Sequence, residues 1–173
     1  MRIPIVNEQD EIIGHKERYE KASGDINRVS RLFVFNEKGE FLVAKRQLVK
    51  KTEPDKWGPS VAGTVDEGYD YDSTVLKEAE EEIGLKNIKP IFYKKIFCEN
   101  KQSRRFAGIY YVTINSKEVK FSLQKEEVSE VKWVSISELE DWFNKKPEDF
   151  VLSFFTTLAN IKEIYAIKNK KTS

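Results

Sequence analysis

The sequence predicts a protein of the α/β or α+β class, and two observations support this prediction. Short runs rich in β-branched and aromatic residues alternate with a few stretches of helical periodicity, which is typical of one sheet packed against helices. The length of 173 residues, with 39% hydrophobic and 34% charged side chains, suits one globular domain that buries its own core. We therefore expect residues 1–173 to form a single domain without repeats.

The charge balance and the cysteine content exclude several classes of protein. A net charge of +1 provides no general attraction to nucleic-acid polymers or to membranes. No apolar run is long enough to cross a bilayer and the N-terminus lacks the apolar core of a signal peptide, so we expect a cytoplasmic protein. The single cysteine, Cys98, excludes an internal disulfide, and its apolar neighbours favour a buried structural thiol. The oligomeric state is left open, with a homodimer as one alternative.

The first part of the chain is expected to form an N-terminal extension over residues 2–26. Residues 2–13 contain two β-rich runs around the turn residues 7–10 and predict a small hairpin. Residues 15–22 are highly charged, and we expect a short helix there. His15 is the only histidine and has no partner motif, so we expect it at the surface.

The main sheet is predicted from further runs of β-branched and aromatic residues bounded by turn residues. The clearest is a hairpin, because the turn residues 36–39 separate two such runs. We expect strands at 29–35, 40–45, 60–65, 90–99, 106–114, 118–123 and 128–136. Residues 48–58 and 100–105 are polar and are expected to form a loop and a turn.

Two helices are predicted near the C-terminus. A serine, Ser135 or Ser137, precedes a glutamate by three residues, which is a capping-box pattern. Pro147 opens the last helix, expected over residues 147–167. Its core-facing side chains repeat at helical spacing and are Phe150, Phe154, Leu158, Ile161 and Tyr165.

Residues 63–85, GTVDEGYDYDSTVLKEAEEEIGL, contain the most informative pattern, a loop that runs into a helix. Asp72 or Ser73 is expected to cap this helix, and Gly84 is well placed to end it. Its apolar face consists of Val75, Ala79 and Ile83.

The same helix carries three glutamates, Glu78, Glu81 and Glu82, at offsets of three and four. These offsets place the side chains on one face, and like charges so placed destabilise a helix by about 0.2–0.5 kcal/mol per pair. A divalent cation relieves the repulsion because hard cations bind carboxylate oxygens. The face is therefore a candidate metal site, whereas Glu80 points away and is expected to be solvated.

The pattern resembles the Nudix box, in which glycines and acidic residues occupy fixed positions. The matching residues, with no insertion between them, are Gly63, Glu78, Ala79, Glu81, Glu82, Gly84 and Leu85. The resemblance implies an α/β/α sandwich with a mixed β-sheet. It also implies hydrolysis of a diphosphate linkage with the help of Mg²⁺ or Mn²⁺.

Two positions depart from the family pattern, because Tyr69 stands in place of a glutamate and Lys77 in place of an arginine. In the family these two residues usually pair and brace the loop against the helix. We expect Lys77 to pair with Asp70 or Glu67 instead, in a looser brace, since lysine cannot form a bidentate fork. We expect the departures at Tyr69 and Lys77 to affect the positioning of the loop and the reaction rate more than the binding of metal.

Most of the chain is similar to the branch of the family related to isopentenyl diphosphate isomerase. That isomerase needs a cysteine where this chain has Ala62 and a metal-binding histidine where it has Thr64. Both differences favour hydrolysis over isomerisation. The alternative to an enzyme is a binding module that takes up a diphosphate in a metal-dependent way without catalysis. The departures from the family pattern at Tyr69 and Lys77 motivate this alternative.

The resemblance implies roles for individual carboxylates. Glu78, Glu81 and Glu82 are the expected metal ligands and catalytic residues, and one of them or a loop carboxylate acts as the base. Glu127 is a further candidate ligand, with an exposed loop charge as an equal alternative. Glu99 is a weaker candidate.

The expected substrate is a small molecule, either a nucleoside-diphosphate-type compound or another organic diphosphate. Arg46 and Arg105 are candidate substrate-binding residues, with a structural ion pair and a solvated turn as the respective alternatives. The carbonyl of Ala62 is a candidate metal contact. Trp57 is expected to pack in the core rather than to stack on a base.

Overall fold

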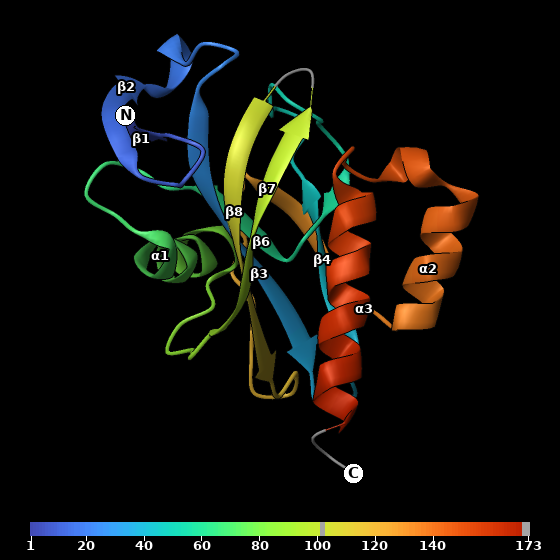
Figure 1. The fold of residues 1–173 in the computed structure, drawn as a ribbon. Helices are drawn as coiled ribbons and strands as arrows, with labels where there is room; N and C mark the ends of the chain where they lie inside the picture. Colours follow the sequence, from blue (N-terminus) through green and yellow to red (C-terminus); the bar gives the residue numbers. More distant parts are fainter. Residues whose placement is uncertain (101–102, 171–173) are drawn as a thin grey trace.

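The structure is a computed structural model that describes residues 1–100 and 103–170 (Figure 1). Within these residues the chain forms one nine-stranded sheet flanked by helices. The strands are β1 (Arg2–Val6), β2 (Ile12–Glu17), β3 (Ile26–Asn36), β4 (Phe41–Arg46), β5 (Trp57–Gly58), β6 (Val61–Thr64), β7 (Ile91–Asn100), β8 (Ser103–Ile114) and β9 (Val128–Val134). The helices are α1 (Tyr71–Ile83), α2 (Ile136–Lys145) and α3 (Phe154–Lys170), with short 3₁₀ turns η1 (Arg18–Glu20) and η2 (Pro147–Asp149).

The long strand β3 is the centre of the sheet. β8 pairs with it in parallel along its whole length, from Ile26 opposite Arg104 to Asn36 opposite Ile114. On its other side, β3 pairs antiparallel with β1, β6 and β4. β7 extends the sheet beyond β8, while β9 and β5 both pair with β4. The sheet is therefore mixed, and the predicted fold class is confirmed.

The side chains of β3 alternate between two hydrophobic cores, as the two-residue period of a strand requires. Leu32 and Val34 pack against α1, whereas Phe33 and Phe35 pack against α2 and α3. The expected apolar face of α1 is buried and consists of Val75, Ala79 and Ile83. Figure 1 shows α1 on one side of the sheet and α2 and α3 on the other, which gives the layers of an α/β/α sandwich. No helix in the described residues is long and apolar enough to cross a membrane.

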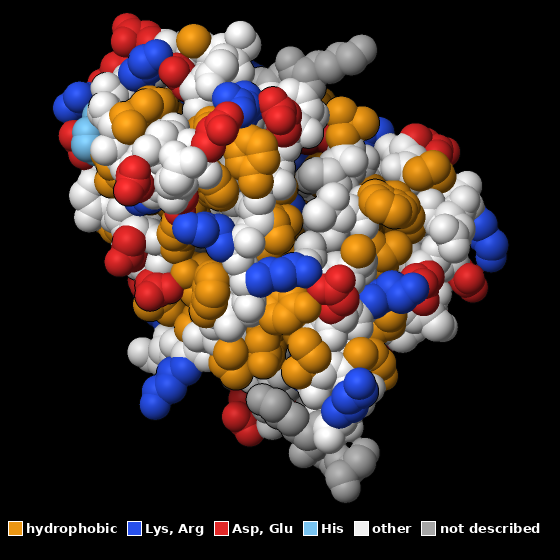
Figure 2. Space-filling model, viewed as in Figure 1, with side chains coloured by type: hydrophobic (Ala, Val, Ile, Leu, Met, Phe, Trp, Pro, Cys, Tyr) orange, Lys and Arg blue, Asp and Glu red, His pale blue; other side chains and the backbone are white. Residues whose placement is uncertain are grey.

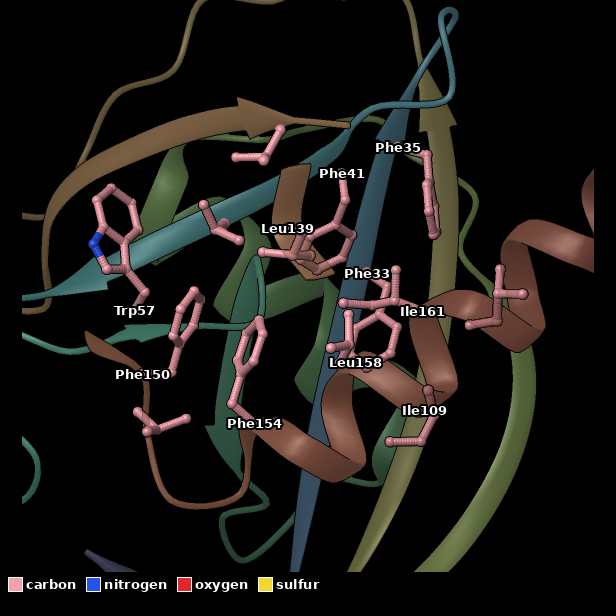
Figure 3. Packing of buried hydrophobic residues seen from close by; sticks show 14 of the residues in the cluster. Phe33, Phe35, Phe41, Trp57, Ile109, Leu139, Phe150, Phe154, Leu158 and Ile161 are labelled. Carbon is pink, nitrogen blue, oxygen red and sulfur yellow. The ribbon is translucent and has the colours of Figure 1, made fainter. Parts of the chain in front are cut away.

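Aromatic rings dominate the core under α3 (Figure 3). Phe33 and Phe41 meet edge to face with their centroids 5.7 Å apart, and the rings of Phe150 and Phe154 lie 4.3 Å apart. Trp57 is buried beside them, so its predicted role in core packing is confirmed. Truncating one such ring to alanine typically lowers the free energy of unfolding by roughly 3–5 kcal/mol. The packing on this face therefore stabilises the sheet that carries α1 on its other face.

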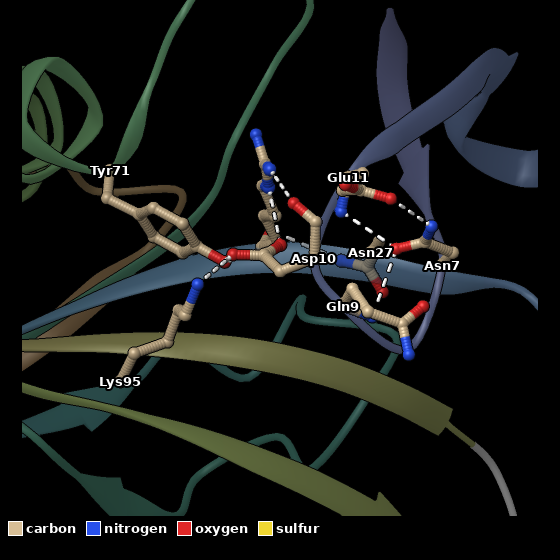
Figure 4. Close-up of polar contacts among 8 residues, drawn as sticks. Asn7, Gln9, Asp10, Glu11, Asn27, Tyr71 and Lys95 are labelled. Atoms are coloured by element: carbon tan, nitrogen blue, oxygen red, sulfur yellow. Dashed lines mark hydrogen bonds and ion pairs between the residues drawn. The ribbon is translucent and has the colours of Figure 1, made fainter.

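A buried carboxylate ties the β1–β2 hairpin to the start of α1. Asp10 lies in the turn of the hairpin with a φ of 64° and is 8% exposed. Arg28 donates from Nε to its Oδ1 at 2.8 Å, and the Tyr71 hydroxyl donates to its Oδ2 at 3.1 Å. Lys95 reaches the same carboxylate from β7 (Figure 4). Burial and the charge of Asp10 raise the pKa of Tyr71, so the hydroxyl stays a donor and the first residue of α1 is fixed against the sheet.

The predicted helix over residues 15–22 is wrong. β2 continues to Glu17 and pairs with β1, with Ile3 opposite Lys16, and only Arg18–Glu20 form a 3₁₀ turn. The pairing satisfies the backbone N–H and C=O groups of this charged stretch. Its charges therefore mark an exposed strand rather than a helix face.

The strand expected at 128–136 stops at Val134 because Ser135 caps α2. The Ser135 hydroxyl accepts a hydrogen bond from the N–H of Glu138 at 3.3 Å, and Glu138 accepts one from the N–H of Ser135 at 3.1 Å. This is the predicted capping box, and Ser135 is the cap of the two serines considered.

The last helix begins later than predicted. Pro147 opens only the turn η2, and α3 starts at Phe154. Between them, Val151 donates its N–H to the carbonyl of Trp57 at 2.9 Å, and Phe150 forms a β-bridge with Trp57. This pairing holds the segment extended along β5. The predicted core face is retained, with Tyr165 half-buried and the others buried: Phe150, Phe154, Leu158 and Ile161.

β7 is an edge strand of the described sheet, because it pairs only with β8. Ile91, Phe92 and Phe97 on this strand are exposed. Figure 2 views this side of the molecule and shows hydrophobic side chains interspersed with charged ones. Lysines on an edge strand, here Lys94 and Lys95, disfavour pairing with another chain.

Candidate active site

Helix α1 begins at Tyr71 because Asp70 caps it. Asp70 Oδ1 accepts the N–H of Ser73 at 2.8 Å, and Ser73 Oγ accepts the N–H of Asp70 at 2.9 Å. Such a reciprocal capping box contributes about 1 kcal/mol. The prediction that Asp72 or Ser73 is the cap is wrong, because Asp72 lies in the first turn and accepts a hydrogen bond from the Tyr110 hydroxyl.

Gly84 ends α1, as predicted, with a φ of 70°. The N–H of Leu85 donates to the carbonyl of Ala79 at 2.9 Å, which is the long bond of a Schellman motif. A Cβ atom at residue 84 would lie 2.9 Å from the Cβ of Ser122, so the following loop also requires glycine here.

The loop before β9 closes over the C-terminal end of α1. Ser122 and Gln124 donate their N–H groups to the carbonyls of Ile83 and Glu82, both at 3.0 Å. The strand predicted at 118–123 is therefore wrong, because the backbone of this stretch bonds to free helix carbonyls and not to another strand. The same bonds place Glu127, a few residues further on, beside the end of α1.

The first glycine of the box is required by a close approach between a strand and a helix. Gly63 of β6 pairs with Ser30 of β3, and Glu78 of α1 lies against the Gly63 backbone. A Cβ atom at residue 63 would fall 2.2 Å from Cγ and Cδ of Glu78. Only glycine leaves room for the carboxylate, so the sheet itself fixes the position of Glu78.

Glu82 is the carboxylate whose surroundings most disfavour a negative charge. Burial, followed by the nearby charge of Glu78, raises the pKa of Glu82 to about 8. A long hydrogen bond of 3.4 Å from the N–H of Ala62 opposes this shift. Glu127 adds to the repulsion, although it forms an ion pair with Lys50. Because these carboxylates repel one another at the edge of a cavity, the donor set suits a hard divalent cation.

Glu81 and Glu80 lie on different sides of α1. Glu81 is half-exposed, and its carboxylate is 3.7 Å from the Lys77 ammonium. Glu80 is paired with Lys86 at 3.0 Å in solvent, which confirms its predicted exposure. In the part of the chain that the structure describes, no three acidic, cysteine or histidine side chains already converge as a metal centre. A cation that used Glu81 would have to draw it away from Lys77.

Lys77 and Tyr69, the two departures from the family pattern, contact each other. The Lys77 ammonium lies 5.3 Å from the centroid of the Tyr69 ring and 3.2 Å from Asp66 Oδ2. The predicted partners of Lys77 are wrong, because Asp70 caps α1 and Glu67 pairs with the N-terminal strand. A cation–π contact and an ion pair, each worth at most about 1 kcal/mol at this exposure, brace the loop.

A cavity of about 630 Å³ lies beside Glu82 and Glu127. Arg46 lies in its wall, but its Nη2 donates to the carbonyl of Thr52 at 2.8 Å and its Nε donates to that of Glu53 at 3.1 Å. These bonds close the loop that follows β4. Arg46 therefore shapes the rim of the cavity through its contacts with the loop backbone.

Arg105 lies in the same wall, on β8 and not in the predicted turn. It donates to the Ser103 hydroxyl at 2.8 Å. Its neighbour Arg104 is paired with Glu99 at 2.9 Å. Glu99, the weaker candidate ligand, does not line the cavity that contains Glu82.

Two other reactive side chains also lie outside this wall. Cys98 is half-buried and packs against the aromatic core, as expected of a structural thiol. His15 lies on β2, with its Nδ1 3.7 Å from Glu67 in the N-terminal hairpin. Neither side chain contributes to the cavity beside Glu82.

Four further basic residues line the cavity and were not predicted from the sequence: Arg18, Arg31, Lys45 and Lys51. Lys45 lies on β4 and is paired with Asp55 at 2.7 Å. Arg18 and Lys51 lie in short connections and carry no pattern. Arg31 did carry a signal, because it is a charged residue in a strand whose neighbours at the same alternation, Phe33 and Phe35, are fully buried.

These features define a class of protein, an α/β/α sandwich that carries a carboxylate cluster on one helix beside a cavity with a basic wall. The chain belongs to the Nudix family, because the family model described as NUDIX domain matches residues 26–154. This match spans residues 63–85 and also Glu127.

Relatives and solved structures agree with this assignment. The chain is 28% identical over 170 residues to the uncharacterized Nudix hydrolase lmo0368 of Listeria monocytogenes, covering 97% of this chain and 95% of that one. It is 26% identical over 138 residues to the uncharacterized Nudix hydrolase YfcD of Escherichia coli K12, covering 79% and 75%. The structure of DR0079 from Deinococcus radiodurans matches with a TM-score of 0.79 and 20% identity over 93% and 99% of the chains. A C. elegans Ap4A hydrolase matches with a TM-score of 0.59 and 19% identity over 81% and 98%, and both structures support the fold alone.

Proposed function

We propose that the protein hydrolyses a diphosphate linkage in a small organic diphosphate, with Mg²⁺ or Mn²⁺ as its cofactor. The observation that carries the proposal is the position of Glu78 and Glu82. Both lie against the backbone of β6, at Gly63 and Ala62. Burial is the largest cause that raises the pKa of each, and the charge of Glu81 adds to the shift of Glu78 while the charge of Glu78 adds to that of Glu82. Ionised carboxylates in such surroundings gain most from a bound cation.

Glu78, Glu82 and Glu127 would hold the cation, with Glu81 joining them once it leaves Lys77. When bound, such a cation would neutralise the charge of the diphosphate and lower the pKa of a water molecule. Either Glu82 or Glu127 would be the base that accepts a proton from the attacking water. The basic residues of the cavity wall counter the remaining negative charge of the substrate, while Arg46 keeps the rim in place.

Hydrolysis is favoured over isomerisation by the residues in the cavity wall. Ala62 and Thr64 both line the cavity, at the positions where isopentenyl diphosphate isomerase needs a cysteine and a histidine. A methyl group cannot transfer a proton, and a threonine hydroxyl is a much poorer metal ligand than imidazole. Isopentenyl diphosphate therefore serves as a negative control.

One observation favours a second candidate, a diphosphate-binding module without turnover. The Lys77 ammonium lies 3.8 Å from the Glu78 carboxylate and 3.7 Å from that of Glu81. A cation of the protein itself in this position competes with the metal ion. Metal-dependent ligand binding without product release would identify this alternative.

The test is a substrate panel with Mg²⁺, Mn²⁺ or EDTA. The panel contains nucleoside diphosphates and triphosphates, sugar diphosphates and dinucleoside polyphosphates, including Ap4A because a fold neighbour is described as its hydrolase. We expect metal-dependent release of phosphate products from at least one class, reduced by about 10²-fold or more in Glu82→Gln. Glu80→Gln is the matched control, because Glu80 lies on the same helix outside the cavity. Equal turnover by Glu82→Gln and the parent would refute the proposal.

A further inference from the structure

Arg31 carries a buried charge and a hydrogen-bond donor that is not satisfied. It lies in the central strand β3, between the backbones of Ala62 on β6 and Ile109 on β8, and is 5% exposed. Its Nη1 is buried and has no hydrogen-bond partner among the described residues. Burying a guanidinium donor without an acceptor is costly, because its hydration is lost and nothing replaces it. Such a group in a native fold calls for an explanation, and a missing anionic ligand is one.

Arg31 lines two adjoining cavities. One is the cavity of about 630 Å³ beside Glu82, and the other, of about 530 Å³, lies between β7 and the start of α3. Both are lined by the same five residues: Arg31, Asn100, Arg105, Leu152 and Ser153. The space beside the carboxylates therefore continues past Arg31 toward Cys98 and Thr156.

The charges around this second space are unbalanced. Burial is the main cause that lowers the pKa of Arg31, and the charge of Arg105 lowers it further, whereas Cys98 and Glu53 raise it. Glu53 is a nearby acid, but it accepts the N–H of Leu152 at 2.5 Å. Glu99 also lines the space and is paired with Arg104 at 2.9 Å. Two guanidinium groups thus line this second cavity together with one acid, Glu99, which is paired with Arg104.

The first turn of α3 adds to the positive potential. Ser153 and Thr156 line the cavity at the N-terminal end of this 17-residue helix. Free N–H groups and the helix dipole favour an anion at such an end. This effect alone would not define a site, but here it acts together with a buried, unpartnered guanidinium.

We propose that Arg31 and Arg105 form a phosphate-binding subsite, which takes a phosphate group of the substrate separate from the diphosphate held beside Glu82. The inference rests on the proposed function and narrows its substrate class to organic diphosphates that also carry a phosphate monoester. A phosphate dianion matches two guanidinium groups in charge, and its oxygens match the planar fork of arginine. The two cavities, which meet at Arg31, place the two anionic parts of such a substrate on either side of that residue.

Inorganic phosphate tests the subsite without any hydrolysis. It is titrated in EDTA into the parent protein, Arg31→Gln, Arg105→Gln, Glu82→Gln and Arg104→Gln, and binding is followed by calorimetry and by the shift of Tm. We expect saturable binding to the parent that weakens at least tenfold in Arg31→Gln and in Arg105→Gln. Binding is unchanged in Glu82→Gln and in Arg104→Gln, the matched control whose guanidinium is already ion-paired. If Arg31→Gln does not fold, the more accessible Arg105→Gln carries the test.

Either of two outcomes would overturn the subsite. One is that the parent protein does not bind phosphate saturably, and the other is that Arg31→Gln and Arg105→Gln bind phosphate as tightly as the parent protein does. A second measurement links it to turnover by comparing a hydrolysed diphosphate with its phosphate-monoester derivative. We expect a lower KM for the derivative, and we expect Arg31→Gln or Arg105→Gln to raise that KM at least tenfold more than it raises the KM of the diphosphate without the monoester. Phosphate binding in EDTA together with an inactive substrate panel would leave the subsite standing and remove the hydrolase proposal.

Discussion

The acidic wall, by which we mean Glu78, Glu82 and Glu127, and the basic wall of the cavity beside Glu82 are built in different ways. Glu82 and Glu127 line the cavity, whereas Glu78 lies against Gly63, a residue of the lining. Glu78 and Glu82 come from adjacent turns of one helix, and a loop that bonds to the end of the same helix brings Glu127 to them. Arg31 and Arg105 come from the paired strands β3 and β8, which are widely separated in the sequence. The acidic wall is thus a local structure with one addition, whereas the basic wall exists only once the sheet has formed.

The two walls also differ in how their charges are compensated. Lysines lie near the carboxylates, with Lys50 paired to Glu127 and Lys77 within 3.8 Å of Glu78. The buried Nη1 of Arg31 has no such partner in the described part of the chain. Flexible lysine partners suit a site whose cation is exchanged, whereas a fixed guanidinium in the sheet suits recognition of one anionic group.

The largest expected effect comes from Gly63→Ala, which acts on the acidic wall alone. The new Cβ would lie 2.2 Å from Glu78, so either the carboxylate or β6 must move. We expect kcat/KM to fall by about 10²-fold or more, because a shift of about 1 Å in a catalytic group has this cost. Overpacking should also destabilise the fold by roughly 1–3 kcal/mol, measurable by urea unfolding.

Gly14→Ala is the control for this substitution, because nothing lies within 4 Å of the added Cβ on β2. Phosphate binding in EDTA should persist in Gly63→Ala, since Arg31 and Arg105 are on other strands. A Gly63→Ala protein with unchanged turnover would show that the close approach of Glu78 to the sheet has no role in the reaction.

A smaller effect is expected on the stability of the fold, which should depend on pH and on Mg²⁺ through Glu82 of the acidic wall. Glu82 has a folded-state pKa of about 8 against an ordinary value of 4.5, so the folded protein holds this proton more tightly than the unfolded chain does. In EDTA, its contribution to stability should therefore decrease as the pH rises from about 4.5 to about 8 and change little above that. Mg²⁺ binds the ionised carboxylate, so its stabilising effect should grow over the same interval. At a concentration one hundred times its Kd, the gain is about 2.7 kcal/mol.

Unfolding by urea at pH 6 and pH 8.5, with Mg²⁺ or EDTA, measures both effects. Glu82→Gln should reduce the pH dependence in EDTA and weaken the stabilisation by Mg²⁺, while Glu80→Gln should preserve both. Equal stabilisation by Mg²⁺ at the two pH values in the parent protein would contradict a metal site built on Glu82.

The contrast between the walls explains how much the sequence could predict. Helical spacing is a local property, so Glu78, Glu81 and Glu82 on one face, the core residues Val75 and Ala79, and the closing glycine all follow from it. The fold class follows from the alternation of strand and helix signals. The partners of individual side chains do not follow from such local patterns. Lys77 pairs with Asp66 rather than with either predicted acid, because the conformation of the loop determines which carboxylate lies near its ammonium group.

The errors in the strand and helix predictions have a common physical cause, namely competition for backbone hydrogen bonds. Residues 118–123 have the composition of a strand, yet Ser122 bonds to the open end of α1. Residues 15–17 have the composition of a helix, yet β1 pairs with them. Arg31 could have been noticed as a charge inside an apolar strand, but its cavity requires β7, β8 and α3 together, and no local pattern encodes that meeting.

The smallest expected effect concerns the brace between Tyr69 and Lys77, where the chain departs from the family pattern. An exposed cation–π contact contributes about 0.5–1 kcal/mol, so a double-mutant cycle with Tyr69→Leu and Lys77→Met should give a coupling of that size in urea unfolding. Lys77→Met should also strengthen Mg²⁺ binding, because it frees Glu78 and Glu81 from a competing ammonium. Lys86→Met is the matched control, since Lys86 pairs with Glu80 outside the cavity. A coupling near zero with unchanged Mg²⁺ affinity would mean that the acidic wall is organised without this brace, by the capping box and the close approach to Gly63 alone.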